Sequence, residues 1–152
     1  MANKNNFAYE FIRVQKDEEH ILALYNLLKN RRYNISNTST PSFAEHRSFV
    51  MRHPYRFWFL IKYNFCVIGS IYFLKNNCIG IYLIDQKLDA IRHVINWALK
   101  KYKPLPAIKS VRSANFHINL APNNKKSQKL LMNIGAVPLQ ITFDLGSVIG
   151  HL

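Results

Sequence analysis

One stretch near the C-terminus decides the fold of this 152-residue chain: Asn115-Phe116-His117-Ile118-Asn119-Leu120-Ala121-Pro122-Asn123-Asn124-Lys125-Lys126-Ser127-Gln128-Lys129-Leu130-Leu131-Met132-Asn133-Ile134-Gly135-Ala136. Apolar and polar residues alternate from 116 to 120, which is the period of a strand. After Pro122, Asn123 or Asn124 can cap a helix, because its side-chain oxygen accepts from free backbone N–H groups. Gly135 stands where a left-handed residue ends a helix. The stretch therefore predicts a strand, a turn, a short helix and a stop.

The rest of the chain continues this alternation of strands and helices. Asp17 can cap the first predicted helix, and Ser42 with Glu45 has the spacing of a capping box for the second. The predicted helices cover 17–29, 42–51 and 89–102, and the predicted strands cover 7–14, 55–62, 65–74, 78–84, 115–120 and 137–145. There is no repeat and no low-complexity linker. We expect a single domain over residues 1–152, in the order β-α-α-β-β-β-α-β-α-β.

Composition indicates a globular, cytoplasmic chain. Apolar residues make up 49% and aromatic residues 13% of the sequence. No uncharged apolar run approaches the roughly 20 residues of a membrane span, and residues 1–6 lack the apolar core of a signal peptide. Cys66 and Cys78 have no metal-ligand spacing, so we expect reduced thiols and no metal, although a hairpin could bring the two together.

The formal charge of +13 is unevenly distributed. Residues 1–45 hold six Lys/Arg and five Asp/Glu, whereas residues 46–152 hold fifteen Lys/Arg and three Asp/Glu. Such a field attracts polyanions, which include nucleic acid, an anionic membrane and a phosphorylated small molecule. A generally basic surface without a specific partner explains the same count.

The opening stretch resembles the cofactor-binding half of the GCN5-related N-acetyltransferase (GNAT) superfamily. Asn124, Ser127 and Gly135 match the spacing of its Asn-x-x-Ala/Ser and glycine positions, while Leu131 replaces an aromatic residue and Ala136 a phenylalanine. The predicted element order is also the GNAT order. The resemblance implies an α/β (α+β) fold with a mixed central sheet of six to seven strands and about four helices. It implies an acyl-CoA-dependent N-acyltransferase that uses acetyl-CoA or another acyl-CoA.

A finer resemblance concerns the acceptor. The hairpin sequences over 65–72 and 76–83, the segment Glu45-His46-Arg47-Ser48-Phe49 and the segment 139–145 are similar to small bacterial GNAT proteins that act on amino sugars of nucleotide-sugar pathways. This resemblance implies a small, phosphorylated amine acceptor such as a nucleotide-linked amino sugar. Arg31 and Arg32 suit that acceptor, because guanidinium groups match phosphate oxygens, although they could equally be the basic end of a helix.

One segment departs from the superfamily pattern. The pyrophosphate loop of GNAT proteins contains glycines, which let the backbone approach the phosphates at a helix N-terminus. Here Leu83-Ile84-Asp85-Gln86-Lys87-Leu88-Asp89 has no glycine and is short. Gln86 and Lys87 could still contact phosphate, or the segment could be a tight turn with Asp89 as a helix cap. The cofactor contacts implied by the resemblance are Leu83, Ile84, Gln86, Lys87, Asn119, Asn124 and Ser127.

Catalysis in this superfamily needs a deprotonated amine and a proton acceptor. The candidates for the general base are His46 on the second predicted helix and His117 on the fifth predicted strand, although each could be a purely structural histidine. Leu131 occupies the position of the tyrosine acid that many members use. Tyr72 and Tyr82, on central strands, could line the acceptor pocket together with Arg31 and Arg32.

Two other functions remain open. The altered loop and the absent tyrosine favour a GNAT fold that has lost catalysis and serves as a binding protein. The basic half favours an acyltransferase or binder that acts on RNA such as charged tRNA, although no motif of aromatic and basic residues for RNA recognition is present. We expect weak nucleic-acid binding at most, and a homodimer is possible.

Overall fold

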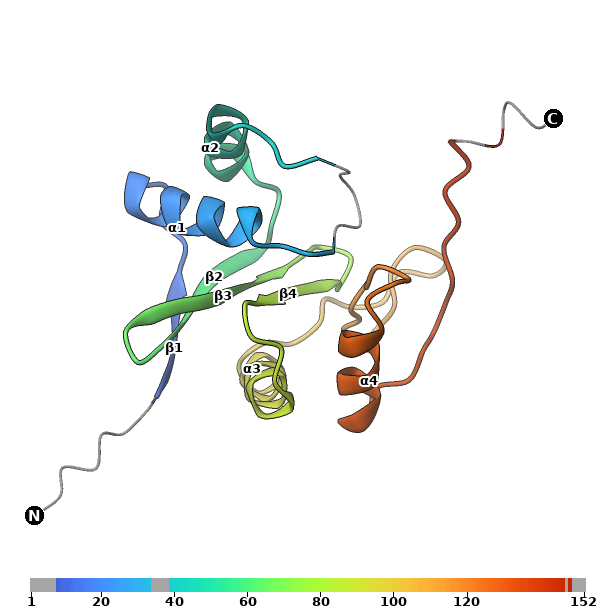
Figure 1. The fold of residues 1–152 in the computed structure, drawn as a ribbon. Helices are drawn as coiled ribbons and strands as arrows, with labels where there is room; N and C mark the ends of the chain where they lie inside the picture. Colours follow the sequence, from blue (N-terminus) through green and yellow to red (C-terminus); the bar gives the residue numbers. More distant parts are fainter. Residues whose placement is uncertain (1–7, 34–38, 147, 149–152) are drawn as a thin grey trace, which may run out of the picture.

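The computed structural model describes residues 8–33, 39–146 and 148. Its elements along the chain are β1 (Tyr9–Arg13), α1 (Glu18–Lys29), α2 (Phe43–Arg52), β2 (Phe57–Tyr63), β3 (Cys66–Phe73), β4 (Ile79–Leu83), α3 (Leu88–Lys101) and α4 (Lys125–Asn133). Figure 1 shows α1 and α2 on one side of the sheet, and α3 and α4 toward the other. The expected α+β class and the four helices are confirmed.

The strands form one antiparallel sheet in the order β1-β2-β3-β4. Tyr63 pairs with Cys66, so the β2–β3 turn consists of Asn64 and Phe65. Both turn residues have positive φ, 50° and 66°, as a two-residue hairpin turn of type I′ requires. The short connections therefore make neighbours of consecutive strands, as the sequence predicts.

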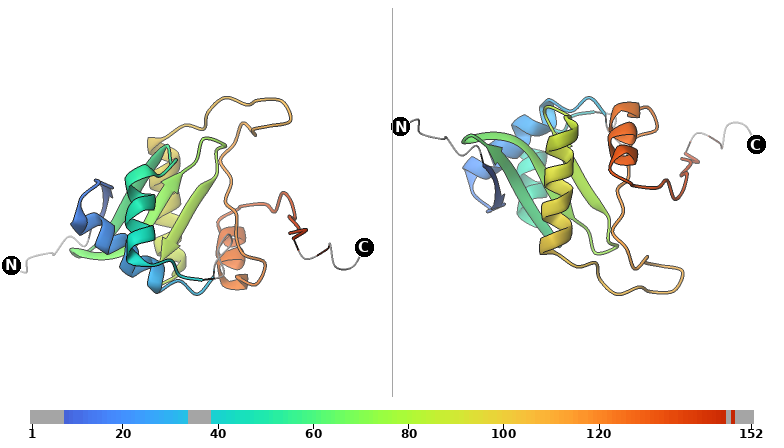
Figure 2. Two further views of the ribbon diagram at one scale, coloured as in Figure 1. Left: turned by 90° about the horizontal axis from the view of Figure 1, so that it is seen from above. Right: turned by 90° about the horizontal axis from the view of Figure 1, so that it is seen from below.

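Each face of the sheet has its own apolar core. On one face α3 contributes Ala90, Val94 and Ala98 to a cluster with β2, β3 and β4. On the other face α1 and α2 contribute Ile21, Leu24, Leu27 and Val50, packed on Trp58 and Leu60 of β2. Figure 2 shows the sheet between these two helical layers. The alternation of side chains along each strand places one set of residues on each face.

Local capping follows the sequence at three of the four helices. The Asp17 side chain accepts from the His20 N–H, and Ser42 with Glu45 forms the complete capping box. Asn124 accepts from the Ser127 N–H at the start of α4. The alternative that Asp89 caps α3 is wrong: the N-cap is Lys87, which makes no side-chain cap, and Asp89 lies in the first turn.

The expectation of six to seven strands is not met, because the described part of the chain forms four. Residues 116–120 contact the sheet through a single parallel bridge between His117 and Cys78, and 137–145 form no strand. The start of the expected first strand, at residue 7, lies outside the described residues. The C-terminal segment has the alternation of a strand but no neighbouring strand among the described residues, and a strand exists only when its backbone is paired.

Candidate active site

The strand β4 and the segment that follows α3 meet at one point and then separate. The Ile79 N–H donates to the His117 carbonyl at 2.8 Å, and the His117 N–H donates to the Asn77 carbonyl at 3.1 Å. In an antiparallel pair, alternate residues direct their backbone groups away from the partner strand. The Ile84 N–H donates to the Ile68 carbonyl of β3. Ile81 and Leu83 therefore direct their backbone N–H and C=O groups away from β3. Within the described residues, no hydrogen bond satisfies these groups of Ile81 and Leu83.

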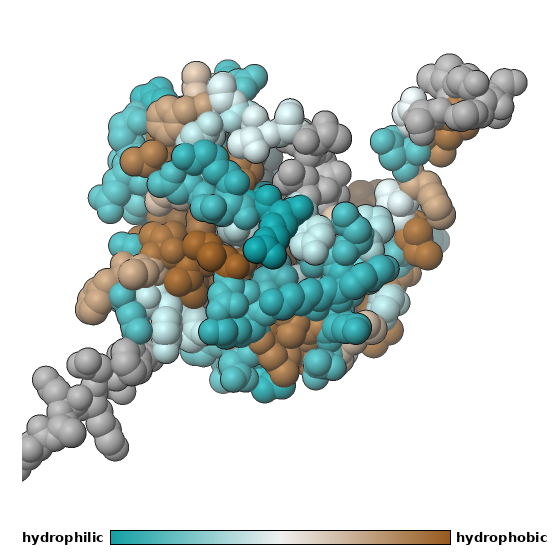
Figure 3. Space-filling view, viewed as in Figure 1, coloured by the Kyte–Doolittle hydropathy of each residue, from teal (hydrophilic) through white to brown (hydrophobic). Residues whose placement is uncertain are grey.

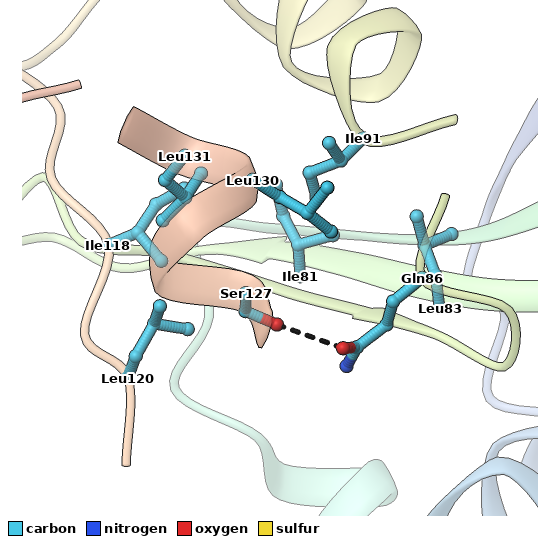
Figure 4. A pocket seen from close by; sticks show the side chains of 9 residues that line it. All are labelled: Ile81, Leu83, Gln86, Ile91, Ile118, Leu120, Ser127, Leu130 and Leu131. Carbon is cyan, nitrogen blue, oxygen red and sulfur yellow. Dashed lines mark hydrogen bonds between the residues drawn. The ribbon is translucent and has the colours of Figure 1, made fainter. Parts of the chain in front are cut away.

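A narrow apolar slot lies beside this open edge. Its cavity volume is about 30 Å³, within about 390 Å³ of empty space that includes open solvent. Its lining residues are Ile81, Leu83, Gln86, Ile91, Ile118, Leu120, Ser127, Leu130 and Leu131. Figure 4 shows these side chains converging from β4, α3, α4 and the 118–120 segment. The Ser127 hydroxyl donates to Gln86 Oε1 at 3.1 Å across the polar end of the slot. The slot is therefore apolar along its length and polar at the ends of two helices.

The turn between β4 and α3 is tight, as one of the two interpretations of its sequence predicts. Lys87 Nζ lies 2.8 Å from Asp85 Oδ2, and Asp89 pairs with Arg92 at 3.7 Å. The carboxylates that would oppose a phosphate therefore have cationic partners close by. No hydrogen bond from the N–H groups of residues 88–90 is found in the described part of the chain, and the helix dipole makes such a terminus favourable for anions.

The start of α4 places three lysines near the same end of the slot. Asn124 is buried and its oxygen is used by the helix cap, so its amide stabilises α4 directly. Lys125, Lys126 and Lys129 are exposed on the helix that Asn124 begins. We expect them to contribute positive potential beside the slot, because the apolar walls focus the field of nearby charges.

Tyrosines and one arginine gather on the opposite face of the sheet. The rings of Tyr55 and Tyr72 stack at 4.2 Å with an angle of 7°, and the guanidinium carbon of Arg31 lies 5.3 Å from the centre of the Tyr82 ring. A Cβ placed on Gly80 would lie 2.0 Å from Tyr72 Cζ, so Tyr72 crosses β4 where the strand has no side chain. We call Arg31, Tyr55, Tyr72 and Tyr82 the tyrosine cluster.

The electrostatics of the tyrosine cluster favour neutral phenols. Burial raises the pKa of Tyr55, Tyr72 and Tyr82 above the ordinary value, and the positive charge of Arg31 partly opposes each shift. Arg31 Nε is buried and has no hydrogen-bond partner among the described residues. An unpaired buried donor of this kind costs free energy, and an anionic ligand would satisfy it.

His117 and Asn119 belong to the same face as the tyrosine cluster. Phe116 and Ile118 pack into the core under α3, so the residues that alternate with them face the other way. Asn119 Nδ2 lies 3.6 Å from Cys78 Sγ. Burial raises the pKa of the Cys78 thiol, and a hydrogen bond from the Asn119 backbone opposes this shift. Cys78 and Cys66 are both free.

His46 lies between α1 and α2. It is 5% exposed, and its Nε2 lies 3.2 Å from the Ile21 carbonyl oxygen, which can only accept, so Nε2–H donates. Burial lowers the pKa of His46; the bond to Ile21 opposes this shift and the charge of Arg31 adds to it. The ring is therefore neutral at neutral pH and joins two helices, and its role as general base stays a prediction.

The structure thus divides the candidate residues between two sides of the sheet. Leu83, Gln86 and Ser127 line the slot, Lys87 and Asn124 lie at the helix ends beside it, and Ile84 is exposed with its N–H bound to β3. Asn119, proposed from the sequence as a cofactor contact, lies on the tyrosine face instead. Arg32 is exposed and affects Tyr82 only through its charge. The part of the acceptor loop beyond residue 33 lies outside the described residues.

Several residues of the site could not be identified from the sequence. Tyr55 joins the cluster by stacking on Tyr72 of β3, and Cys78 lies beside Asn119. The apolar slot lining from Ile118 to Leu131 has the sequence pattern of ordinary core. Gly80 gives the one available signal, since a glycine inside a strand pattern indicates close approach of another group. Among the described residues there is no cluster of metal ligands, and none of the helices is long and apolar enough to cross a membrane.

The fold is that of acetyltransferases of known structure. One is the aminoglycoside N-acetyltransferase AAC(6′)-Iy in complex with CoA, at 11% identity and a TM-score of 0.59 over 94% of this chain and 97% of that one. A possible acetyltransferase from Clostridium difficile is 8% identical, with a TM-score of 0.54 over 90% of this chain and 95% of that one. A domain from Methanocaldococcus jannaschii is 18% identical, with a TM-score of 0.57 over 84% of this chain and 88% of that one. At these identities the likeness shows the fold alone. No family model and no curated protein sequence matches the chain.

Proposed function

We propose that the protein is an acyl-CoA-dependent N-acyltransferase. The observation that carries this proposal is the open edge of β4, where the backbone groups of Ile81 and Leu83 border an apolar slot. A chain that carries amides along an apolar arm fits such an edge, because it can pair with the backbone as a strand would. The pantetheine arm of coenzyme A has that chemistry.

The other parts of the slot suit the remaining groups of the cofactor. The uncapped N-terminus of α3 and Lys87 are placed for a diphosphate, and Lys125, Lys126 and Lys129 add positive charge at the start of α4. When bound, an acyl-CoA supplies a thioester whose carbonyl carbon an amine can attack. The Leu83 N–H lies at the end of β4 and would donate to the developing oxyanion there.

The proton of the amine needs an acceptor on the acceptor side of the sheet. His117 lies on that face and its ring has no hydrogen bond within the described part of the chain, whereas His46 uses Nε2 to hold Ile21. The neutral tyrosines of the cluster can donate hydrogen bonds but do not accept a proton readily. We therefore favour His117 as the base, directly or through water, with His46 as the alternative.

The acceptor we propose is an amine that carries an anionic group, such as a phosphorylated amino sugar. Arg31 Nε is a buried donor without a partner among the described residues, and the guanidinium carbon lies 5.3 Å from the Tyr82 ring centre. No Asp or Glu occurs among the residues that shift the pKa values of Tyr55, Tyr72 and Tyr82. A polycationic aminoglycoside would meet arginines there, and like charges disfavour binding. The charge therefore favours a nucleotide-linked amino sugar over the acceptor named for AAC(6′)-Iy.

Cofactor binding is tested first, without any acceptor. The protein is melted with and without acetyl-CoA, and a ligand at about 100 times its dissociation constant adds roughly 2.7 kcal/mol of stability. Leu131→Trp fills the slot and is expected to weaken binding by at least about tenfold. Met132→Trp is the matched control on the exposed side of the same helix. No melting shift and no calorimetric heat with the unmodified protein would refute the proposal.

The acceptor class is tested by turnover. Acetyl transfer to a nucleotide-linked amino sugar and to an aminoglycoside is compared, and only the former is expected to be acetylated. Arg31→Ala should raise KM for the anionic acceptor by about 10-fold to 100-fold, the value of a lost hydrogen bond to a charged group. Arg31→Lys keeps the charge but not the planar fork, and is expected to lie between. Preference for the aminoglycoside would overturn the acceptor assignment.

A second candidate is a binding protein of the same fold without turnover. It is favoured by the glycine-free turn in which Asp85 is paired with Lys87, since this pair has to open before Lys87 can contact a phosphate. A melting shift with coenzyme A but no transfer to any amine of the panel would favour this candidate.

A further inference from the structure

The C-terminal segment, residues 137–145, has the pattern of a strand but no strand partner among the described residues of its own chain. Its five apolar side chains are Val137, Leu139, Ile141, Phe143 and Leu145, which are 74%, 76%, 83%, 80% and 69% exposed. The segment is extended, because the side chains of Gln140 and Thr142 lie on one side and meet at 3.4 Å. No backbone hydrogen bond of residues 137–144 is found within the described part of the chain. Figure 1 shows the segment leading away from α4.

Exposure of these apolar side chains and unpaired backbone groups to solvent is energetically unfavourable. Alternating apolar residues on an extended backbone with free N–H and C=O groups form a template for pairing with another strand. Figure 3 shows hydrophobic surface along the strip that leads to the grey C-terminal residues. The segment therefore needs an occupant that supplies both backbone partners and apolar contacts.

The sequence of residues 137–145 is self-complementary when two copies are paired as antiparallel strands. In the order Val-Pro-Leu-Gln-Ile-Thr-Phe-Asp-Leu, apolar residues occupy both ends, the centre and every second position. An antiparallel pair of two copies, centred on Ile141, places each apolar residue opposite another apolar residue. The remaining pairs are Gln140 with Thr142 and Pro138 with Asp144, so no like charges face each other. A two-fold axis requires this kind of self-complementary surface.

Pro138 determines which residues of the proposed antiparallel pair exchange backbone hydrogen bonds. Proline has no N–H, so its backbone nitrogen has to point away from the partner strand. With Ile141 at the axis, Pro138 belongs to a non-hydrogen-bonded pair when the apolar residues are the hydrogen-bonded ones. In this register the Pro138 nitrogen points away from the partner strand, so the missing N–H of proline costs no inter-strand hydrogen bond.

The charge of the molecule also favours this segment as the place of contact. One chain carries 21 Lys/Arg and a net charge of +13, but none of the Lys/Arg lies between residues 130 and 152. Two copies repel each other over most of their basic surface. Around the C-terminal segment they can approach without bringing cationic side chains of that segment together.

We propose that the protein is a homodimer in which the C-terminal segments of two copies pair as antiparallel strands about a two-fold axis at Ile141. The occupant is thus a second copy of this chain. The segment leaves α4 at Gly135, whose φ of 93° is left-handed and which has open space on the side where a Cβ would lie. This inference does not depend on the proposed activity.

The oligomeric state is the first test. Sedimentation equilibrium of the full chain should give twice the 17.8 kDa mass of one chain. Ile141→Asp places two carboxylates opposite each other at the axis and should give the monomer mass. Val111→Asp, a change at a residue 75% exposed in another part of the surface, is the matched control and should stay dimeric. Circular dichroism should show that both variants fold, because both sites are exposed.

The register is the second test. In a Cys66→Ser background, Gln140→Cys protein is mixed with Thr142→Cys protein and mildly oxidised. The pair is expected to crosslink, because non-hydrogen-bonded partners have Cα atoms about 4.5 Å apart, within the range that a disulfide spans. Gln140→Cys alone should crosslink far less.

Three outcomes would overturn the proposal. A monomer at every concentration means that the segment pairs with its own chain or with a different protein. A dimer that survives Ile141→Asp uses another surface. A disulfide of Gln140→Cys with itself, in place of the mixed one, refutes the register and the axis.

Discussion

Gly80 decides the position of an aromatic ring on the neighbouring strand. Tyr72 lies across β4 where a Cβ of residue 80 would be 2.0 Å from its ring, and it is also stacked on Tyr55. The sheet itself does not require glycine there, because the φ of Gly80 is not in the left-handed region. The requirement comes from space alone, and this makes it testable by adding one methyl group.

Gly80→Ala is expected to destabilise the protein by about 1–3 kcal/mol, the usual cost of overpacking. Urea unfolding of the variant measures this cost. In a Tyr72→Ala background the same change should cost much less, because the ring it displaces is gone. Equal costs in the two backgrounds would show that Tyr72 does not occupy the space above Gly80.

His46 is expected to make stability depend on pH. Burial lowers its pKa in the folded state, so the unfolded chain binds a proton more readily below the ordinary histidine pKa of about 6.5. This contribution is present in full above that value and is lost as the pH falls toward the lowered pKa of the folded state. His53 has a pKa lowered mainly by burial as well and acts in the same direction.

The measurement is the urea midpoint between pH 5 and 8 for the unmodified protein and for His46→Gln, which keeps an amide donor for the Ile21 carbonyl. His46→Gln should flatten the acid side of the profile, and His53→Gln is the control for the second histidine. If His46 is also the general base, His46→Gln abolishes the pH dependence of turnover. If its role is to join α1 and α2, the pH dependence of turnover is unchanged.

At the scale of the element, α4 shows how a residue expected to hold a ligand can instead hold a helix. The oxygen of Asn124 accepts from the Ser127 N–H at 3.2 Å, and the residue is buried at the start of the helix. The spacing that resembles the cofactor motif is therefore also the spacing of an ordinary N-cap.

Asn124→Ala is expected to cost about 1 kcal/mol of stability, and Asn124→Ser, which can also cap, a few tenths. Thermal unfolding measures both. Because α4 lines the slot, the alanine variant should also weaken acetyl-CoA binding, whereas the serine variant should restore it. If Asn124→Ser caps the helix but leaves cofactor binding as weak as in the alanine variant, the amide itself contacts the cofactor.

At the scale of the whole molecule, the excess of basic charge predicts weak and non-specific binding to RNA. The binding should disappear at moderate salt, because each phosphate contact releases condensed counterions and makes affinity fall steeply with ionic strength. Filter binding or fluorescence anisotropy across a salt series measures the slope. The triple variant Lys125/Lys126/Lys129→Ala should reduce that slope, with Lys100/Lys101→Ala as the control on α3. Tight tRNA binding near physiological salt, lost in the triple variant, would overturn the small-molecule acceptor.

Among the sequence-based predictions, those that depend on neighbours in the chain are the ones confirmed. The helical periods of α1 and α3, the Asp17 and Ser42–Glu45 caps and the tight β2–β3 turn all rest on residues within a few positions of one another. Local propensity and hydrogen bonding decide such features. The place of Asn77 could not be predicted in this way, since its amide donates to the carbonyls of Leu105 and Ser113, which follow α3 in the sequence.

The sequence by itself determined the type, order and approximate ends of the eight helices and strands in the described part of the chain, because periodicity and capping are local. The strands that it also predicted at 115–120 and 137–145 do not form there. Only the tertiary structure decided that β4 and residues 116–120 share one bridge and then separate, which opens the slot. It also decided that Arg31, Tyr55, Tyr72 and Tyr82 converge, and that residues 137–145 have no strand partner within the ranges 8–33 and 39–146. These features depend on where segments distant in sequence meet, and on packing that only the complete set of elements can define.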